Sequence, residues 1–266
     1  MPAPFHPRRR LLLSATLSAL LLGACGKQSN DPQSQANRVY RVGTDAAYAP
    51  MEMVSADKQI TGFDIDLLRA IAAKGGFEVE FVNTPFESIF NSLAQNDRDV
   101  LISSITITDK RRQMVDFSEP YFEARQMIVT TQENQHIHNA QDLIPLKIGV
   151  QSATTGDFMA QKLLGGSNPA IRRFESMPMA LAELASGGVD AVIGDETVVR
   201  HFLHNNQVGD ARKALRLLSD DGFEKEYYGI AVRKGEQELL EKINRGLAAV
   251  KADGTYDKLK VKYFGS

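Results

Sequence analysis

The sequence predicts an α/β protein built on open, parallel-type sheets with helices on both faces. The first observation is that short β-rich runs alternate with amphipathic helical stretches from residue 39 onward. The second is that 266 residues, 43% of them hydrophobic and 24% charged, suffice for one large domain or two small ones. The third is that no low-complexity segment or tandem repeat interrupts the alternation. Disordered, collagen-like and polytopic membrane proteins are therefore excluded.

The first 24 residues have the features of a secretory signal peptide. Arginines at positions 8 to 10 precede an apolar run over residues 11–24. As a helix this run would rise about 21 Å, which is too short for the roughly 30 Å hydrocarbon core of a bilayer. It ends in residues 21–25 (LLGAC), which resemble the lipobox of bacterial lipoproteins. The resemblance implies that Cys25 is lipidated and begins the mature chain, whereas a lone cysteine is otherwise most often a buried thiol.

Residues 25–38 are expected to form a lipidated tether. Between residues 26 and 37 the only aliphatic side chain is that of Ala36, and a flexible segment of this length reaches roughly 20 Å. The mature chain would carry 28 basic and 33 acidic residues, a balance that gives no general attraction for nucleic acid. The single cysteine excludes an intrachain disulfide and an all-cysteine metal site.

The body of the chain divides into strands and helices in a regular order. The β-rich runs predict strands over residues 39–44, 77–82, 99–105, 126–131, 147–150, 190–193, 215–219 and 228–232. Helical spacing predicts helices over residues 64–74, 85–94, 155–164, 177–185, 196–203 and 237–251. In the first of these, Ile65, Leu68, Ile71 and Ala72 recur at three- and four-residue steps and form one apolar stripe.

Two acidic residues follow strands at the positions where α/β sheets bind ligands. Asp45 comes after the first strand, and Asp195 follows Gly194 at the end of the strand over residues 190–193. Ligands of open α/β sheets lie beyond the carboxyl ends of the strands. We therefore expect Asp45 and Asp195 to face one cleft between two lobes, although a glycine–acid turn is often only a helix cap.

Two hydroxyl-rich turns are candidates for an anion site. Residues 103–111 (SSITITDKR) bring hydroxyls near Arg111, whose planar guanidinium can bind a carboxylate with two hydrogen bonds. Residues 151–156 (QSATTG) offer backbone amides at the start of a helix. A solvated basic helix face and an ordinary N-cap are the alternatives. Near the strand ends, Tyr48 and Phe86 could enclose a flat or cationic side chain.

Signatures of other chemistries are missing from the sequence. It contains no GxxxxGK[ST], GxGxxG, GxSxG or HExxH motif. The histidines at positions 136, 138, 201 and 204 lack the acids or cysteines at the spacing that a zinc site needs. We therefore expect no cofactor and no metal.

Several segments closely resemble the polar amino-acid-binding proteins of bacterial ABC importers, the extracellular solute-binding proteins of family 3. The resemblance covers about residue 39 to the end and is carried by residues 43–50 (GTDAAYAP), 62–68 (GFDIDLL), 103–111, 116–121 (DFSEPY), 252–258 (ADGTYDK) and 262–265 (KYFG). The pair Ser103 and Ser104 is similar to the branch that binds lysine, arginine, ornithine or histidine.

The resemblance implies a two-lobe periplasmic-binding-protein fold of type II. One lobe would contain residues 39–121 and 229–266, the other residues 127–222, with hinge strands over residues 122–126 and 223–228. It also implies a monomeric, lipid-anchored receptor on the periplasmic face of a bacterial membrane. This receptor would capture a basic or polar amino acid, arginine favoured, and deliver it to an ABC permease without catalysing a reaction.

Residue roles follow from the same resemblance. Arg111 would bind the α-carboxylate of the ligand with help from Thr106, Thr154 and Thr155. Asp195 from the opposite lobe and Ser104 would bind its α-ammonium. Selectivity for the side chain would fall to Asp45, Tyr48, Phe86, Ser103 and Gln151, with Asp64 nearby. The sequence departs from the family at Ala153, where glycine is common, which puts the roles of Thr154 and Thr155 in question.

Alternatives of other classes stay open. Some relatives on this scaffold are exported dehydratases of aromatic amino-acid precursors, for which Glu196 is the candidate acid. The other hypotheses are a binding protein specific for glutamine or histidine, and a sensor that signals through a partner.

Overall fold

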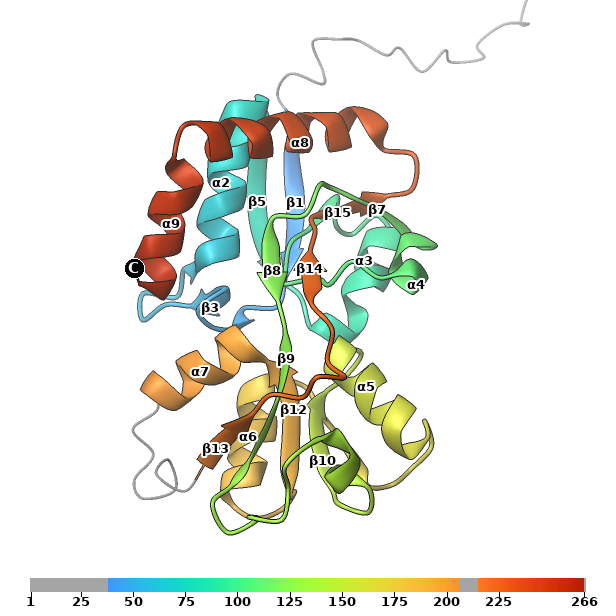
Figure 1. Ribbon diagram of the computed structural model, residues 1–266. Coiled ribbons are helices and arrows are strands. Elements are labelled where there is room, and N and C mark those ends of the chain that lie inside the picture. The colour runs from blue at the N-terminus through green and yellow to red at the C-terminus, as the bar shows by residue number, and fades with distance from the viewer. Residues whose placement is uncertain (1–37, 206–214, 266) are drawn as a thin grey trace, which may run out of the picture.

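The computed structural model describes residues 38–205 and 215–265, which form two α/β lobes (Figure 1). Each lobe is built around a five-stranded sheet. The predicted signal peptide, Cys25 and the tether lie outside the described residues. Within the described ranges, no helix has the length and apolar character needed to cross a bilayer.

The upper lobe of Figure 1 contains the sheet with strand order β5-β1-β6-β15-β7. These strands are β1 (Val39–Thr44), β5 (Glu78–Asn83), β6 (Val100–Leu101), β7 (Val115–Phe117) and β15 (Ala231–Arg233). Side chains alternate between its faces: Val100 and Val232 join the core under helices α2 (Phe63–Gly75) and α8 (Gln237–Ala252). Leu101 and Ala231 join the core under η1 (Phe86–Ser88) and α3 (Ile89–Ala94).

The lower lobe contains the sheet with strand order β11-β10-β12-β9-β13. Its strands are β9 (Gln126–Thr131), β10 (Ile148–Gln151), β11 (Ile171–Phe174), β12 (Ala191–Asp195) and β13 (Leu215–Leu218). Its helical segments are η2 (Ala140–Leu143), α5 (Thr155–Leu164), α6 (Met177–Ala185) and α7 (Glu196–Asn205). Because β10 and β12 end at the boundary between the lobes, they direct Gln151 and Asp195 toward the upper lobe.

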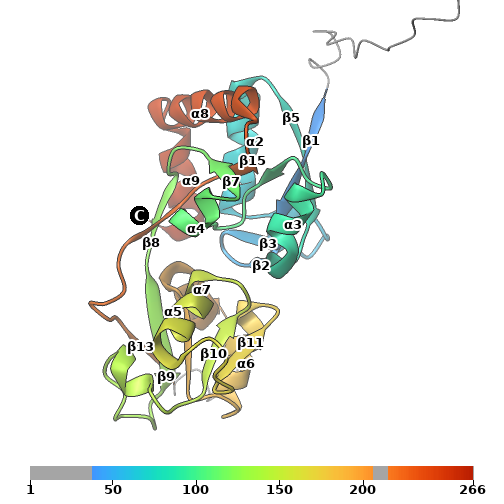
Figure 2. The same cartoon turned by 90° about the vertical axis from the view of Figure 1, so that its right-hand side faces the viewer.

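Two strands connect the lobes along one side of the molecule (Figure 2). The connecting strands β8 (Phe122–Ala124) and β14 (Glu226–Tyr228) pair with each other in antiparallel fashion. They lead into β9 and β15, which run antiparallel to their sheet neighbours. The expectation of parallel-type sheets is therefore corrected to mixed sheets, because the chain enters each sheet from the other lobe through one reversed strand.

Close packing of helices stabilises the upper lobe. A side chain at Gly246 of α8 would place its Cβ 2.3 Å from the carbonyl oxygen of Ile71 in α2, so only glycine allows this approach. Phe63, at the start of α2, is fully buried among the rings of Phe122, Tyr256, Tyr263 and Phe264. The last three belong to α9 (Thr255–Phe264). This helix therefore packs on the core next to the connecting strands.

The predicted alternation of strands and helices is confirmed, but two expected strands are wrong in detail. The strand expected over residues 99–105 ends at Leu101, since Ser104 has a left-handed backbone (φ 49°) that cannot continue a strand. The strand expected over residues 228–232 is two strands separated by Gly229 and Ile230, and a Cβ at Gly229 would lie 2.8 Å from Ile107.

Several short elements were not predicted. They are the three-stranded sheet of β2 (Ala47–Tyr48), β3 (Glu52–Val54) and β4 (Ile60–Thr61), together with α4 (Asp109–Arg112), β7, η2, β11 and α9. The helix expected over residues 85–94 begins as the 3-10 turn η1. Strands of two or three residues show too few alternating positions to be recognised in a sequence.

Candidate ligand-binding site

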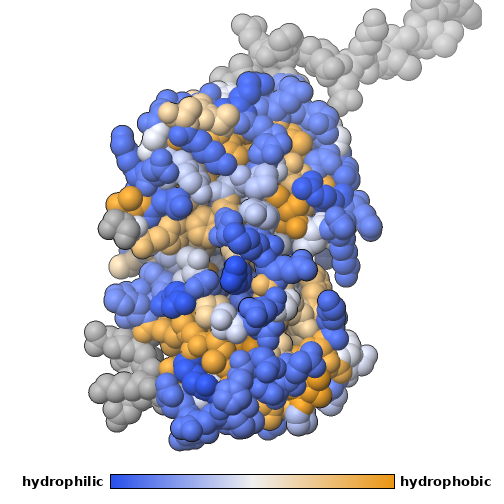
Figure 3. All heavy atoms as spheres, in the orientation of Figure 1, coloured by the Kyte–Doolittle hydropathy of each residue, from blue (hydrophilic) through white to orange (hydrophobic). Residues whose placement is uncertain are grey.

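A small cavity of about 10 Å³, room for about one water molecule, lies between the two lobes. From the upper lobe it is lined by Asp45, Tyr48, Glu52, Phe86, Ser103, Ser104 and Thr106, and from the lower lobe by Gln151, Thr154, Thr155 and Asp195. On the face seen in Figure 3, hydrophilic side chains cover most of the surface, with smaller hydrophobic patches in each lobe.

Almost all the residues expected at the site from the sequence line this one cavity. Arg111 does not line it but donates to the carbonyl oxygens of Thr106, which does, and of Ala153. Asp64 lies behind Ser104. Glu52 lines the cavity but was not expected there. The structure thus brings the expected residues together, while their contacts with a ligand stay a prediction.

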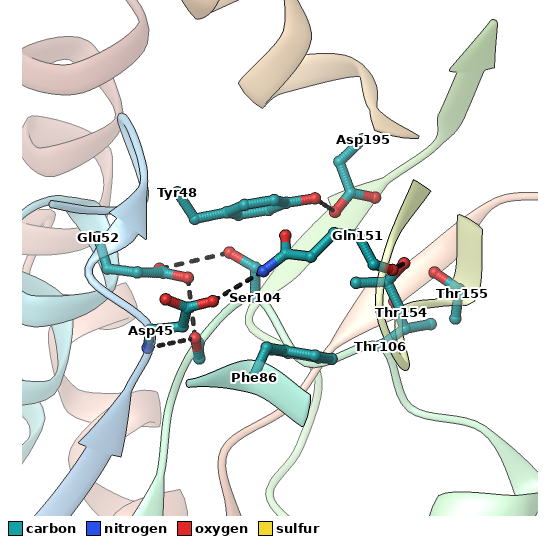
Figure 4. A pocket seen from close by; sticks show the side chains of 11 residues that line it. Asp45, Tyr48, Glu52, Phe86, Ser104, Thr106, Gln151, Thr154, Thr155 and Asp195 are labelled. Atoms are coloured by element: carbon teal, nitrogen blue, oxygen red, sulfur yellow. Dashed lines mark hydrogen bonds between the residues drawn. The ribbon is translucent and has the colours of Figure 1, made fainter. Parts of the chain in front are cut away.

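Two carboxyl groups of the upper lobe form an acidic end of the cavity (Figure 4). Glu52 is fully buried and accepts hydrogen bonds from Ser103 Oγ at 3.1 Å and Ser104 Oγ at 3.4 Å. Burial and the neighbouring Asp64 raise the pKa of Glu52 well above its usual value. Burial also raises the pKa of Asp45 to about 6, although a hydrogen bond from Gln151 opposes the shift. This end of the cavity would gain stability from a cation.

The acid at the start of α2 holds the serine turn in place. Asp64 is fully buried and accepts hydrogen bonds from the backbone N–H of Ser104 at 2.8 Å and the hydroxyl of Tyr121 at 2.7 Å. Burial raises the pKa of Asp64 to about 6. Asp64 therefore fixes the left-handed backbone of Ser104 rather than facing the cavity itself.

Arg111 is a buried cation whose hydrogen bonds go only to backbone oxygens. Arg111 is only 3% exposed. Its guanidinium donates hydrogen bonds to the carbonyl oxygens of Thr106 at 2.9 Å and Ala153 at 3.2 Å. Its guanidinium lies 5.5 Å and 5.4 Å from the ring centroids of Phe86 and Phe90. Among residues 38–205 and 215–265, no carboxylate oxygen lies within 4 Å of it. Burial lowers the pKa of Arg111 to about 10, although the charges of Glu226 and Asp195 oppose the shift.

The turn that carries Ala153 explains why its identity matters. Ala153 adopts a left-handed backbone with φ of 63°, a conformation that glycine adopts with less strain. This conformation directs the carbonyl of Ala153 to the Arg111 guanidinium across the gap between the lobes. The turn thus accommodates alanine where the family commonly has glycine, in the left-handed conformation.

Asp195 of the lower lobe faces the upper lobe. It accepts hydrogen bonds from the hydroxyl of Tyr48 and from the side-chain amide of Gln126. Burial, together with the nearby charge of Glu226, raises the pKa of Asp195 to about 7. The expectation that Asp45 and Asp195 face one cleft is thus met by the geometry.

Aromatic rings enclose the middle of the cavity. Figure 4 shows Tyr48 and Phe86 on opposite sides, with Asp45 and Glu52 at one end and the threonines at the other. Gln151 spans the space between the lobes and donates to Asp45 Oδ2 at 2.7 Å. Among the buried side-chain atoms of the described chain, Gln151 Oε1 is one of those without a hydrogen-bond partner. This arrangement offers a slot for a flat cationic group with an acceptor at its edge.

The end of the cavity that carries Thr154 and Thr155 includes a helix cap. It also includes contacts from two residues that the sequence analysis did not identify. Thr154 donates to the carbonyl oxygen of Gln151 at 2.8 Å and caps α5 by accepting from the N–H of Asp157 at 3.3 Å. Its hydroxyl thus makes the contacts of an ordinary N-cap. Gln126 and Glu226, both on or next to the connecting strands, bond the hydroxyl of Thr155.

Glu196, the candidate acid of an enzyme, lies outside the cavity. Its carboxylate bonds the guanidinium of Arg200 at 2.7 Å on the surface of α7. It lines a separate groove between α7 and α9. The acid that a dehydratase would need is therefore not supplied by Glu196.

Comparisons with known proteins agree with this geometry. The sequence pattern of the bacterial extracellular solute-binding proteins, family 3, matches residues 40–266. A probable histidine-binding protein of Neisseria gonorrhoeae is 41% identical over 251 residues, 93% of this chain and 92% of that protein. The crystal structure of ArtJ, an arginine-, lysine- and histidine-binding protein of Geobacillus stearothermophilus, has a TM-score of 0.80 and 42% identity, covering 86% of this chain and 96% of that one.

A second similar structure is that of an ancestral amino-acid-binding protein described as a precursor of cyclohexadienyl dehydratase. Its TM-score is 0.75 at 38% identity, and the match covers 85% of this chain and 95% of that one.

Proposed function

The chain belongs to the bacterial extracellular solute-binding proteins of family 3, and on that premise we propose that it captures a cationic amino acid and delivers it to an ABC permease. Arginine is the favoured ligand. Capture would occur by closure of lobes 39–121 with 229–266 and 127–222 about hinges at residues 122–126 and 223–228. No reaction is catalysed in this proposal, and the protein acts as a monomer.

The buried guanidinium of Arg111 is the observation that carries the proposal. Arg111 forms no ion pair within 4 Å in the described chain, and only the more distant charges of Glu226 and Asp195 oppose the cost of its burial. The α-carboxylate of an amino acid is therefore a group that this position favours. Asp195 of the other lobe would bind the α-ammonium. Because each charge belongs to a different lobe, a zwitterion stabilises the closed state by contacts that the open state lacks.

The acidic end supports a cationic side chain. Once Arg111 and Asp195 are assigned to the zwitterion, the carboxyls of Asp45 and Glu52 have no cation of the protein beside them in the described chain. A guanidinium between Tyr48 and Phe86 would supply that charge and donate to the free oxygen of Gln151. Glutamine would bring no positive charge to this end of the cavity. The names of the relatives, which bind arginine, lysine or histidine, point the same way.

A ligand panel tests the function. We expect arginine, lysine or histidine to raise the melting temperature of the protein, and glutamine to do so less. A ligand at about a thousand times its Kd adds about 4 kcal/mol to the free energy of unfolding, which is several degrees for a protein of this size. Thermal shift against the twenty amino acids plus ornithine and citrulline measures the effect.

Each result of the panel has a distinct meaning. A shift with glutamine alone would keep the receptor and reject the acidic end as its selectivity element. If no amino acid shifts the melting temperature, the receptor proposal fails. The purified protein would then be assayed for dehydration of prephenate and arogenate, because Asp195 is a buried acid with the raised pKa of about 7 that such catalysis requires.

Anchoring through Cys25 is part of the same proposal. Lipid attached to this residue would hold the receptor at the periplasmic face of a membrane by the tether of residues 25–38. We expect Cys25→Ser to move the protein from the membrane fraction to the soluble fraction and to abolish its labelling with palmitate. Ser34→Ala in the same tether serves as the control. Wild-type protein found only in the soluble fraction would contradict the anchor.

A further inference from the structure

Glu52 and Asp64 are two acids of the upper lobe that lie next to each other in its interior. Glu52 lines the cavity and Asp64 does not, and both residues are fully buried. Both contact Ser104, since Glu52 Oε2 bonds its hydroxyl and Asp64 Oδ2 accepts from its backbone N–H. The two carboxyl groups also hydrogen-bond each other. Because all three residues belong to one lobe, this arrangement does not depend on contacts between the lobes.

No basic side chain neutralises this pair of acids. Within residues 38–205 and 215–265, no lysine or arginine nitrogen lies within 4 Å of either carboxyl group. The ionisable groups that act on the pair from the neighbouring elements are Asp45, Tyr48 and Tyr121, which are one more acid and two phenols. Two adjacent buried carboxylates repel each other strongly, so such a pair holds one proton between its members.

One oxygen of Asp64 indicates where that proton points. Asp64 Oδ2 accepts hydrogen bonds from the backbone N–H of Ser104 at 2.8 Å and the hydroxyl of Tyr121 at 2.7 Å. Asp64 Oδ1 is also buried, yet no N–H or alcohol donor of the described residues bonds to it. A buried acceptor without a donor is costly and rare. An O–H group on Glu52 supplies the missing donor.

The partners of the two acids decide which of them carries the proton. Burial raises the pKa of Asp64 only to about 6, because the hydrogen bonds from Tyr121 and Ser104 favour its ionised form. Burial and the charge of Asp64 raise the pKa of Glu52 well above its usual value, and the hydrogen bond from Ser103 opposes this. That bond reaches Oε1 at 3.1 Å, whereas the contact of Oε2 with Ser104 is longer, at 3.4 Å. Oε2 is therefore the oxygen that is free to carry a proton.

We propose that Glu52 is protonated at neutral pH and donates its proton to Asp64, so that Asp45 is the acid whose charge meets the side chain of the ligand. Asp45 differs from Glu52 because it accepts from a donor that cannot reverse, the amide of Gln151 at 2.7 Å. The part that concerns the ligand rests on the proposed function, whereas the shared proton is a property of the protein alone. One facing charge matches a side chain with a single positive charge, such as a guanidinium or an ammonium.

Carbon-13 NMR of the ligand-free protein tests the protonation directly. The side-chain carboxyl carbons of glutamate are labelled, and the Glu52 resonance is identified by its loss in Glu52→Gln. At pH 7 we expect this resonance at the position of a protonated acid. Glu238, an exposed acid whose pKa is lowered by its bond to Lys242, supplies the position of an ionised one. A Glu52 resonance at the ionised position would overturn the proposal.

Unfolding by urea gives a second test without ligand. A carboxyl that is held protonated in the folded protein lowers the free energy of unfolding as pH rises from about 4.5 through neutral pH. Glutamine has the shape of the protonated acid, can donate an N–H to Asp64 and has no proton to lose. Glu52→Gln should therefore have a higher urea midpoint than the wild type at pH 8 and a similar one near pH 4. Glu238→Gln is the surface control and should show no such gain, whereas an equal or lower midpoint of Glu52→Gln at pH 8 would contradict the shared proton.

The affinities of two variants for arginine test the role of Asp45. Asp45→Asn removes a charge that faces the ligand, whereas Glu52→Gln replaces a neutral acid by a neutral amide. We expect the Kd of Asp45→Asn for arginine, measured by calorimetry, to exceed that of Glu52→Gln by about tenfold or more. Equal losses of affinity in the two variants would show that Glu52 meets the ligand as a charged acid, and would overturn the proposal.

The outcomes separate this inference from the proposed function. If no amino acid binds, the receptor proposal fails, while the NMR and urea measurements still decide whether Glu52 and Asp64 share a proton. If arginine binds and the Glu52 resonance is that of an ionised acid, the receptor proposal stands and the shared proton is rejected.

Discussion

Arg111→Met is expected to weaken amino-acid binding by about 3 to 5 kcal/mol, a factor of at least a hundred in Kd. The substitution removes the buried charge that would bind the α-carboxylate. It leaves that carboxylate in a cavity whose remaining ionisable groups Asp45, Glu52 and Asp195 are acids. Isothermal titration calorimetry of the variant with the best ligand from the panel gives the Kd.

Arg111→Met is expected to weaken binding without lowering the free energy of unfolding. Arg111 is buried with no carboxylate within 4 Å in the described chain, and Met keeps the length of its stem between Phe86 and Phe90. Replacing such a charge by an apolar side chain is often neutral or stabilising. We therefore expect the ligand-free variant to resist urea at least as well as the wild type. Affinity and stability thus separate, which a variant that simply misfolds would not show.

The neighbouring arginine supplies a matched control. Arg112 follows Arg111 on α4 and is exposed, so Arg112→Met removes the same charge without touching the cavity. It is expected to change Kd by less than threefold. If Arg111→Met binds as tightly as Arg112→Met, the carboxylate subsite lies elsewhere and the assignment of Arg111 is wrong.

The sequence predicted those parts of the site that follow from strand ends and from local turns. Asp45 and Asp195 each follow a strand, so topology alone directs them to the boundary between the lobes. Arg111 and the serines occur in a hydroxyl-rich turn after a strand, which made them candidates for an anion site, although composition alone favoured a solvated helix face. These residues do line or border one cavity.

Other residues could not be predicted because tertiary contacts alone place them. Glu52 lies on the three-residue strand β3, and its burial results from Ser103 and Ser104, which come some fifty residues later. Glu226 meets Thr106 across 120 positions of sequence. That contact depends on how the connecting strands pair with the two lobes. No periodic pattern in the sequence indicates such a contact.

Asp195→Asn is expected to weaken binding of a cationic amino acid by about a hundredfold at pH 8, because the α-ammonium loses its buried counter-charge. The same variant should alter the pH dependence of binding. Burial raises the pKa of Asp195 to about 7, so half of the ligand-free protein holds a proton there at neutral pH. Binding of an ammonium requires the ionised form and releases that proton.

The affinity of the wild type should therefore rise with pH up to about 7 and level off above it. The slope approaches tenfold per pH unit for one controlling group. Burial raises the pKa of Asp45 to about 6. The affinity of Asp195→Asn should therefore still depend on pH below about 6, but more weakly than that of the wild type. Calorimetry at pH 5.5, 6.5 and 8 in buffers of different ionisation enthalpy measures both the affinity and the protons released. Glu196→Gln, on the adjacent surface residue, should behave as the wild type does.

The free energy of unfolding of the ligand-free protein should depend on pH in the opposite direction to the affinity. Measuring it therefore shows the effect of the buried Asp195 charge separately from ligand binding. A carboxyl whose pKa is higher in the folded than in the unfolded protein binds protons more tightly when folded. Its effect is therefore to lower the free energy of unfolding as pH rises from about 4 through 7. Asn has no proton to lose, so Asp195→Asn should be more stable than the wild type at pH 8 and similar to it near pH 4. A variant that loses affinity and is also less stable at pH 8 would mean that Asp195 braces Tyr48 and Gln126 instead of waiting for a cation.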